Sequence, residues 1–121
     1  MGALEYLTQV DRDNFMINID IGHMHCMQTP MRAVHLLRGL VCQCHITDND
    51  GTEHHGGPIG TGTADLAAWI RYLAPFVQET ATAIGDVPAA AVEFGAPDPD
   101  AEIDRVIALL KDLVPELGMG F

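Results

Sequence analysis

Side chains that can bind metal ions or transfer protons concentrate in residues 41–62, VCQCHITDNDGTEHHGGPIGTG. The stretch opens as a short apolar run with β-branched residues and ends in a glycine-rich loop. Three of the six histidines and four acids lie in it or just beyond it: His45, His54, His55, Asp48, Asp50, Glu53 and Asp65. A polar, glycine-rich loop directly after a buried strand is typical of an active-site loop in an α/β protein.

Two other segments resemble the strand that opens this stretch. The three predicted strands are residues 15–21, 40–46 and 89–94. Each ends at or beside a side chain that can bind a metal ion: Asp20, His45 and Glu93. Because the carboxyl ends of parallel strands meet at one edge, we expect these three side chains to lie together. Two carboxylates and an imidazole suit Mn²⁺, Mg²⁺, Co²⁺ or Zn²⁺, with positions left open for substrate oxygens.

Helical segments must position these strands. Apolar spacing and capping residues predict helices at residues 3–10, 30–37, 64–73, 76–84 and 99–114. Pro30 would begin the second of them after a Thr29 cap, and Gly39 would stop it. Thr63 would cap the third, and Pro75 would separate the third from the fourth. The last would begin with an Asp98 cap and Pro99. Residues 22–26 are expected to form a loop that carries His23. The order α-β-α-β-α-β-α predicts an α/β fold of parallel β/α units.

The predicted strand at residues 15–21 has two different faces. Alternate residues from Phe15 to Ile21 are apolar, whereas Asn18 and Asp20 belong to the opposite, more polar face. A polar face that is uncharged until its end suits the interior of a barrel better than open solvent. Three strands are too few to close a barrel, and an open sheet would expose its edges. We therefore expect a single unit, residues 1–121, that is part of a larger TIM-type barrel.

Composition limits the possible partners. The 121 residues include 17 acids and 6 bases, which gives a net charge of −11. A surface this negative disfavours nucleic acid and anionic lipid. No apolar run approaches the length of a membrane span, and no basic and apolar leader precedes the first helix, so we expect a cytoplasmic protein.

The cysteines allow a second interpretation. The chain has an odd number of cysteines: Cys26, Cys42 and Cys44. We expect them to be buried, reduced thiols. The alternative is a small metal-binding protein that uses these thiols with nearby histidines. His54 and His55 are interpreted as part of a solvated loop. Two further histidines are expected to be structural: His25 and His35.

Four sequence blocks together resemble a known family. They are Ile19-Asp20-Ile21-Gly22-His23, Cys44-His45-Ile46-Thr47-Asp48-Asn49-Asp50-Gly51, Pro58-Ile59-Gly60-Thr61-Gly62 and Val92-Glu93. They are similar to the last three strands of the xylose isomerase-like TIM barrels, a group of sugar isomerases and epimerases, inosose dehydratases and endonuclease IV-type enzymes. The resemblance covers nearly the whole chain but only the carboxyl-terminal half of the family's barrel.

The resemblance implies roles for individual residues. Asp20, His45 and Glu93 would bind a divalent metal ion, and His23 would bind oxygens of a small sugar or sugar-like substrate. Glu93 would also be one of two bases that move a proton between carbons next to a carbonyl, through a metal-stabilised enediolate. Glu53 and His55 are similar to an acid-x-His pair that binds a further metal ion in the endonuclease branch, which the negative charge disfavours.

One expected group has no counterpart in the sequence. The family places another glutamate, both ligand and second base, at the end of the strand before the one that holds Asp20. The only acids before that strand are Glu5, Asp11 and Asp13. The resemblance therefore implies an isomerase or epimerase that is incomplete as a single chain. A second copy or a separate amino-terminal half-barrel would complete it; alternatively, the chain is a non-catalytic assembly fragment with a vestigial site.

Overall fold

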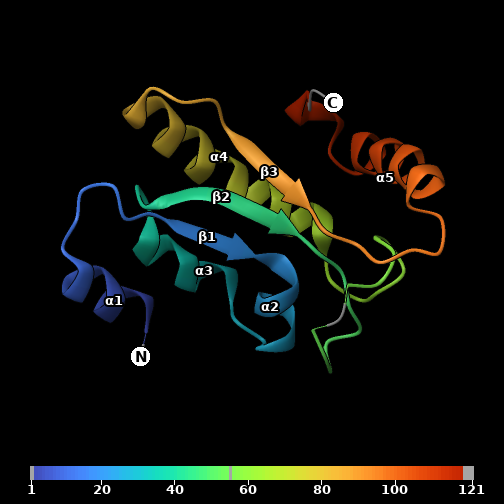
Figure 1. Ribbon diagram of the computed structural model, residues 1–121, viewed down its shortest axis with the longest axis horizontal. Coiled ribbons are helices and arrows are strands. Elements are labelled where there is room, and N and C mark those ends of the chain that lie inside the picture. Colours follow the sequence, from blue (N-terminus) through green and yellow to red (C-terminus); the bar gives the residue numbers. More distant parts are fainter. Residues whose placement is uncertain (1, 55, 119–121) are drawn as a thin grey trace.

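The structure, a computed structural model, describes residues 2–54 and 56–118. Its centre is a parallel sheet of β1 (Ile17–Asp20), β2 (Val41–Ile46) and β3 (Ala89–Val92), in that order (Figure 1). Helical segments connect both pairs of neighbouring strands, which confirms the predicted mixed α/β class. β1 and β3 are shorter than the strands predicted at residues 15–21 and 89–94.

The helices alternate with the strands along the chain. They are α1 (Ala3–Val10), α2 (Ile21–Cys26), α3 (Met31–Val34), the 3₁₀ turn η1 (His35–Leu37), α4 (Leu66–Ile84), α5 (Pro99–Leu113) and the 3₁₀ turn η2 (Pro115–Leu117). In Figure 1, α4 runs behind β2 and β3, and α5 lies to one side of the sheet near the carboxyl terminus. Among the described residues, no helix combines the length and apolar character needed to cross a bilayer.

The end of β1 differs from the prediction. Residues 22–26, expected to form a loop, belong to helix α2. The reason is the Asp20 side chain, which accepts the backbone N–H of His23 at 3.0 Å and so caps the helix. Asp20 is therefore both the last residue of β1 and the cap of α2, so no residues are left to form a loop between them. The following helix also starts later than expected, because Pro30 occupies the cap position predicted for Thr29.

α4 is one helix and not two. It continues through Pro75, and its cap is Asp65, which accepts the N–H of Ala68 at 3.0 Å, not Thr63. Proline inside a helix costs about 3 kcal/mol. The buried stripe that crosses it outweighs this cost, since each large apolar side chain contributes about 1.5–3 kcal/mol when buried. The stripe comprises Leu66, Trp69, Ile70, Leu73, Phe76, Val77, Thr80 and Ala81.

Other predictions of helix ends and caps are confirmed. α1 has the bounds predicted from its apolar spacing, although none of its residues is buried. Gly39 has φ of 84° beyond the 3₁₀ turn, as its predicted stop position requires. Asp98 accepts the N–H of Ala101 at 3.3 Å, and Pro99 opens α5. Capping chemistry is local, and for this reason short sequence patterns predict it well.

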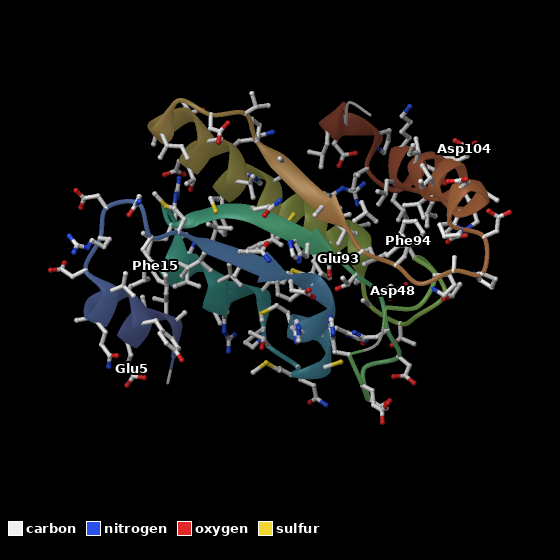
Figure 2. The ribbon with its side chains drawn as sticks, in the orientation of Figure 1. Glu5, Phe15, Asp48, Glu93, Phe94 and Asp104 are labelled. Carbon is white, nitrogen blue, oxygen red and sulfur yellow. The ribbon has the colours of Figure 1, made fainter. Side chains whose placement is uncertain are left out.

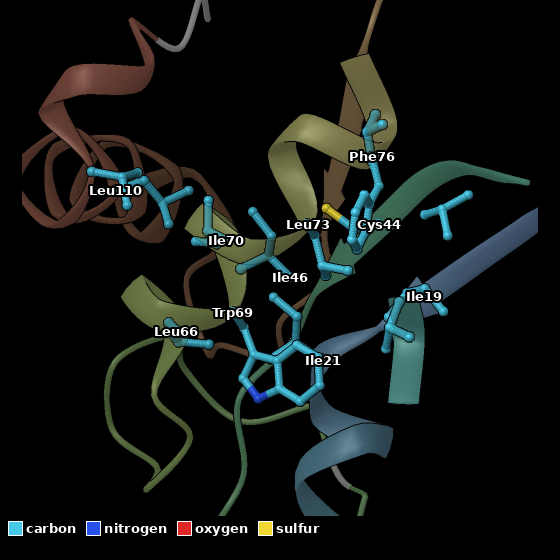
Figure 3. Close-up of a cluster of buried hydrophobic side chains, with 14 of the residues drawn as sticks. Ile19, Ile21, Cys44, Ile46, Leu66, Trp69, Ile70, Leu73, Phe76 and Leu110 are labelled. Carbon is cyan, nitrogen blue, oxygen red and sulfur yellow. The ribbon is translucent and has the colours of Figure 1, made fainter. Parts of the chain in front are cut away.

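The core lies on one face of the sheet. In the sheet register Ile19 is opposite Cys44, and Cys44 is opposite Ala90. Ile19 and Cys44 pack in the core with Val34 of α3 and with the buried stripe of α4 (Figure 3). Both connecting helices therefore cover the same face, as two successive right-handed crossovers require.

The other face of the sheet is more polar and more open. It carries Asn18 beside Gln43, and Gln43 beside Ala89. Asn18 and Ala89 are exposed, and Gln43 is partly buried. The carboxyl end of this face holds the three side chains predicted to bind a metal ion.

Candidate metal centre

The sheet register brings the three predicted ligands together. Asp20 pairs with His45, and His45 pairs with Ala91, two residues before Glu93. The backbone N–H of Glu93 donates to the carbonyl of Ile46 at 3.1 Å, which holds this residue beside the end of β2. His45 Nδ1 lies 3.2 Å from Glu93 Oε1 and 3.8 Å from Asp20 Oδ2. Figure 2 shows Glu93 at the end of β3.

This geometry suits a divalent cation. Ligand atoms about 2.0–2.2 Å from one ion, and roughly 90–110° apart, are separated by about 3.0–3.5 Å. The separation between His45 and Glu93 lies in this range, and that between His45 and Asp20 needs only a small side-chain rotation. The two carboxylates would also neutralise the charge of the ion. Side-chain exposure rises from 13% for Asp20 to 26% for His45 and 52% for Glu93, so the open coordination positions face solvent on the Glu93 side.

A second group shares Asp20. His23 of α2 and His54 of the loop after β2 have ligand atoms close enough to Asp20 to bind an ion with it. The two imidazole rings stack with centroids 3.7 Å apart and planes inclined by 8°. His54 Nε2 lies 3.4 Å from Asp20 Oδ1. His23 is therefore beside the centre, as the resemblance implies, and its contact with a substrate stays a prediction.

His54 is the residue that sequence interpretation missed. It was assigned to a solvated loop, and no spacing pattern distinguishes it from its neighbour. Its position depends on the path of a loop that starts beyond β2 and returns toward α2. Glu53 is exposed and belongs to neither group. His55 lies outside the described residues, so the acid-x-His pair stays a prediction.

Buried polar residues hold that loop in place. Asp48 Oδ2 accepts the N–H groups of Gly60 and Gly62 at 2.8 and 3.0 Å. Asn49 Nδ2 donates to the carbonyl of Gly22 at 3.0 Å, and its Oδ1 accepts the N–H of Gly51 at 2.9 Å. The Gly60–Gly62 turn therefore donates to a carboxylate, which shapes the loop. Together these bonds connect the start of the loop to its later glycine turn and to the start of α2.

Gly22 permits this close packing between α2 and the loop after β2. A Cβ atom at this position would lie 2.4 Å from Thr47 Oγ1 and 2.9 Å from Asn49 Nδ2. Both contacts are shorter than any carbon atom tolerates, so only glycine brings the start of α2 this near. The same approach brings His23 and His54 into stacking contact.

The surroundings of Asp20 lower the pKa of its carboxyl group. Burial by itself raises the pKa of Asp20, but hydrogen bonds from the Thr47 hydroxyl and the His23 N–H oppose it. With the positive field of His23 and His54, these bonds lower the pKa below the ordinary value of 3.8. Asp20 is therefore an ionised carboxylate at neutral pH, the form that binds a cation.

The cysteines do not join either group. Among the described residues, neither candidate metal group contains a thiol. Burial raises the pKa of Cys44 to about 11, which keeps it protonated and unreactive. The Cys26 thiol donates to Asn49 Oδ1 at 3.3 Å, and the Cys42 thiol donates to the carbonyl of Ile17 at 3.6 Å. The three thiols are free, as predicted, but only Cys44 is buried, whereas Cys26 and Cys42 are partly buried. These contacts give no support to a Cys/His metal site.

Two other histidines make structural contacts. His25 Nε2 lies 2.8 Å from Thr63 Oγ1, and His35 packs edge-on against Phe76 with centroids 5.8 Å apart.

No protein-family model matches this chain, and none of the curated proteins is similar to it in sequence. The chemistry of the centre must therefore follow from its own residues.

Proposed function

We propose that Asp20, His45 and Glu93 bind one divalent metal ion, and that the chain is part of a sugar isomerase or epimerase of the xylose isomerase-like type. The observation that carries this proposal is the convergence of three ligand side chains at the carboxyl ends of three adjacent parallel strands. Strand ends on the same edge of a parallel sheet are where α/β barrels place their active sites. The donor set suits Mn²⁺, Co²⁺, Zn²⁺ or Mg²⁺.

The partial TIM barrel belongs to this proposal. Its support is that α3 and α4 pack on one face of the sheet, while the opposite face is polar and open. In a barrel the first face is the outer one and the second lines the interior. Asn18 and Gln43 would then lie inside, below the metal centre, where amide side chains find hydrogen-bonding partners.

The residues present suit proton transfer next to a carbonyl. A bound divalent ion would polarise the substrate carbonyl and so acidify the neighbouring C–H bond. Glu93 is the more exposed of the two carboxylates, so in our proposal it accepts the proton from one carbon and returns it to the next. His23 stands beside the centre, where its ring can donate to or accept from a substrate hydroxyl. The net charge of −11 favours a small sugar over a nucleic acid as substrate.

Among the described residues, the proposed centre contains no second carboxylate base beside Glu93. In the described part of the chain, the two metal-capable groups contain only Asp20 and Glu93 as acids. Inversion of a carbon centre requires an acid and a base on opposite sides of the substrate, whereas transfer between neighbouring carbons on one side requires one group. In our proposal the second base comes from a second copy or an amino-terminal half-barrel that covers the open sheet face, so both isomerisation and epimerisation are compatible with this centre.

Titration calorimetry tests the metal site. Protein freed of metal by chelation should bind about one Mn²⁺ or Co²⁺ per chain, and Asp20→Ala, His45→Ala and Glu93→Ala should each weaken binding at least tenfold. Matched controls are His35→Ala and Asp104→Ala, which remove the same side-chain types away from the centre. Undiminished binding in all three site variants would refute the proposal, as would the absence of binding to the wild type. Loss of binding after thiol alkylation would instead favour the Cys/His alternative.

A further inference from the structure

Thr47 is a buried residue directly after β2 and lies beside Asp20. Its exposed fraction is 1%, and its hydroxyl makes two hydrogen bonds. Oγ1 accepts the backbone N–H of Gly22 at 2.8 Å and lies 2.7 Å from Asp20 Oδ1. Because the Gly22 nitrogen can only donate, the single hydroxyl proton of Thr47 must point to the carboxylate. The direction of this bond is therefore fixed by the backbone.

The two oxygens of Asp20 have different surroundings. Oδ1 accepts from the Thr47 hydroxyl and from the His23 N–H at 3.0 Å, and His54 Nε2 lies 3.4 Å away. A carboxylate oxygen has lone pairs for about two hydrogen bonds. The bonds from Thr47 and His23 therefore occupy both lone pairs of Oδ1. Oδ2 is the oxygen that faces His45, with Nδ1 at 3.8 Å.

We propose that Thr47 is a positioning residue that keeps Asp20 Oδ1 occupied by protein donors and turns Oδ2 toward His45 and Glu93, so that the centre holds one cation. The inference rests on the proposed metal site. It decides between the two groups that share Asp20, because an ion held by His23 and His54 would have to bind the oxygen that Thr47 already occupies. His23 and His54 consequently remain free to contact a substrate.

A pair of isosteric variants tests this role. Thr47→Val removes the hydroxyl and keeps the shape of the side chain, whereas Thr47→Ser keeps the hydroxyl. The matched control is Thr80→Val, since Thr80 is also 1% exposed but its hydroxyl has no hydrogen-bond partner. The readouts are the Co²⁺ dissociation constant by calorimetry, the number of Co²⁺ ions per chain by native mass spectrometry, and the visible absorption spectrum of the Co²⁺-loaded protein.

The wild type should bind one Co²⁺ per chain. Thr47→Val should bind it about 10–100-fold more weakly, the usual effect of losing a partner that orients a metal ligand, and with an altered absorption spectrum. Thr47→Ser should restore the affinity to within a few fold, and Thr80→Val should match the wild type in both measurements. A general loss of packing would affect the two valine variants alike.

Two results would overturn the inference while leaving the proposed metal site intact. One is a Thr47→Val variant with wild-type affinity and spectrum. The other is a wild type that binds two Co²⁺ ions with similar affinity, and this result requires no variant to fold. A wild type that binds no divalent ion would instead overturn the proposed function, and the role of Thr47 with it.

Discussion

Asp20 performs several tasks at once. It ends β1, caps α2 through the His23 N–H, and receives the Thr47 hydroxyl. Its remaining oxygen points toward His45. A glutamate would extend the carboxylate by one methylene and lose the short-range cap. The same carboxylate therefore organises both the local backbone and the proposed centre.

The lowered pKa of Asp20 predicts a pH-dependent effect of Thr47→Val. A carboxylate whose pKa is lower in the folded state stabilises the fold above its unfolded pKa, near 4, and this contribution is lost as pH falls through the folded pKa. At pH 6–7 we expect Thr47→Val to reduce the free energy of unfolding by about 1.5–3 kcal/mol, as for a hydrogen bond to a charged group. The difference from wild type should shrink below pH 4.

Urea unfolding of metal-free protein between pH 3 and 7 measures this difference. Many acids titrate in the same range, but their effects cancel when two variants of one chain are compared. Thr80→Val provides the reference, and its effect on the free energy of unfolding should stay constant with pH. A Thr47→Val effect that is equally constant would show that the hydroxyl does not act through the charge of Asp20.

At the scale of elements, α4 carries the largest departure from local propensity. Pro75 has no N–H for the carbonyl of Arg71 four residues earlier, and its own position is exposed. We predict that Pro75→Ala stabilises the protein by about 1–3 kcal/mol, because it restores a helix hydrogen bond and relieves the steric cost of the ring. Chemical denaturation measures the change, with the exposed neighbour Gln78→Ala as a control expected to stay within about 0.5 kcal/mol. Destabilisation by Pro75→Ala would mean that α4 needs its proline for correct packing.

α4 also indicates which parts of the fold the sequence can predict. Strand periodicity and cap residues act over a few positions, so β2, the Asp98 cap and the convergence of the three strand-end side chains were predicted correctly. Metal binding by these side chains stays a prediction. The break at Pro75 was wrong because burial along the whole helix outweighed a local penalty. The helix at residues 22–26 was missed because its cap, Asp20, had been assigned to a strand.

The residues of the candidate site also differ in whether a local sequence pattern can predict them. Asp20, His45 and Glu93 follow from strand ends, which a periodic pattern reveals. His54 and Thr47 depend on contacts between residues 25 or more positions apart, such as the Thr47 bond to Gly22. No local pattern contains that information, so these residues were recognised only from the fold.

At the scale of the whole molecule, the open sheet face makes the proposed barrel testable. Asn18 is exposed on that face and would lie inside a completed barrel, where an unpaired lysine is strongly unfavourable. We predict that Asn18→Lys leaves the single chain folded but abolishes its assembly, either with a second copy or with a complementary half-barrel. Native mass spectrometry and size-exclusion chromatography would measure assembly, with Ala83→Lys, at an exposed position of α4, as the control.

The overall charge makes the outcome of this experiment easy to interpret. The chain carries a net charge of −11, so an added lysine reduces long-range repulsion between copies. Any loss of assembly in Asn18→Lys must therefore come from the local cost of burying the new charge. Ala83→Lys makes the same change in net charge at a site outside the barrel and should assemble as well as the wild type. Assembly of both variants would show that the polar face stays in solvent, and the metal centre would then have to function on an open sheet.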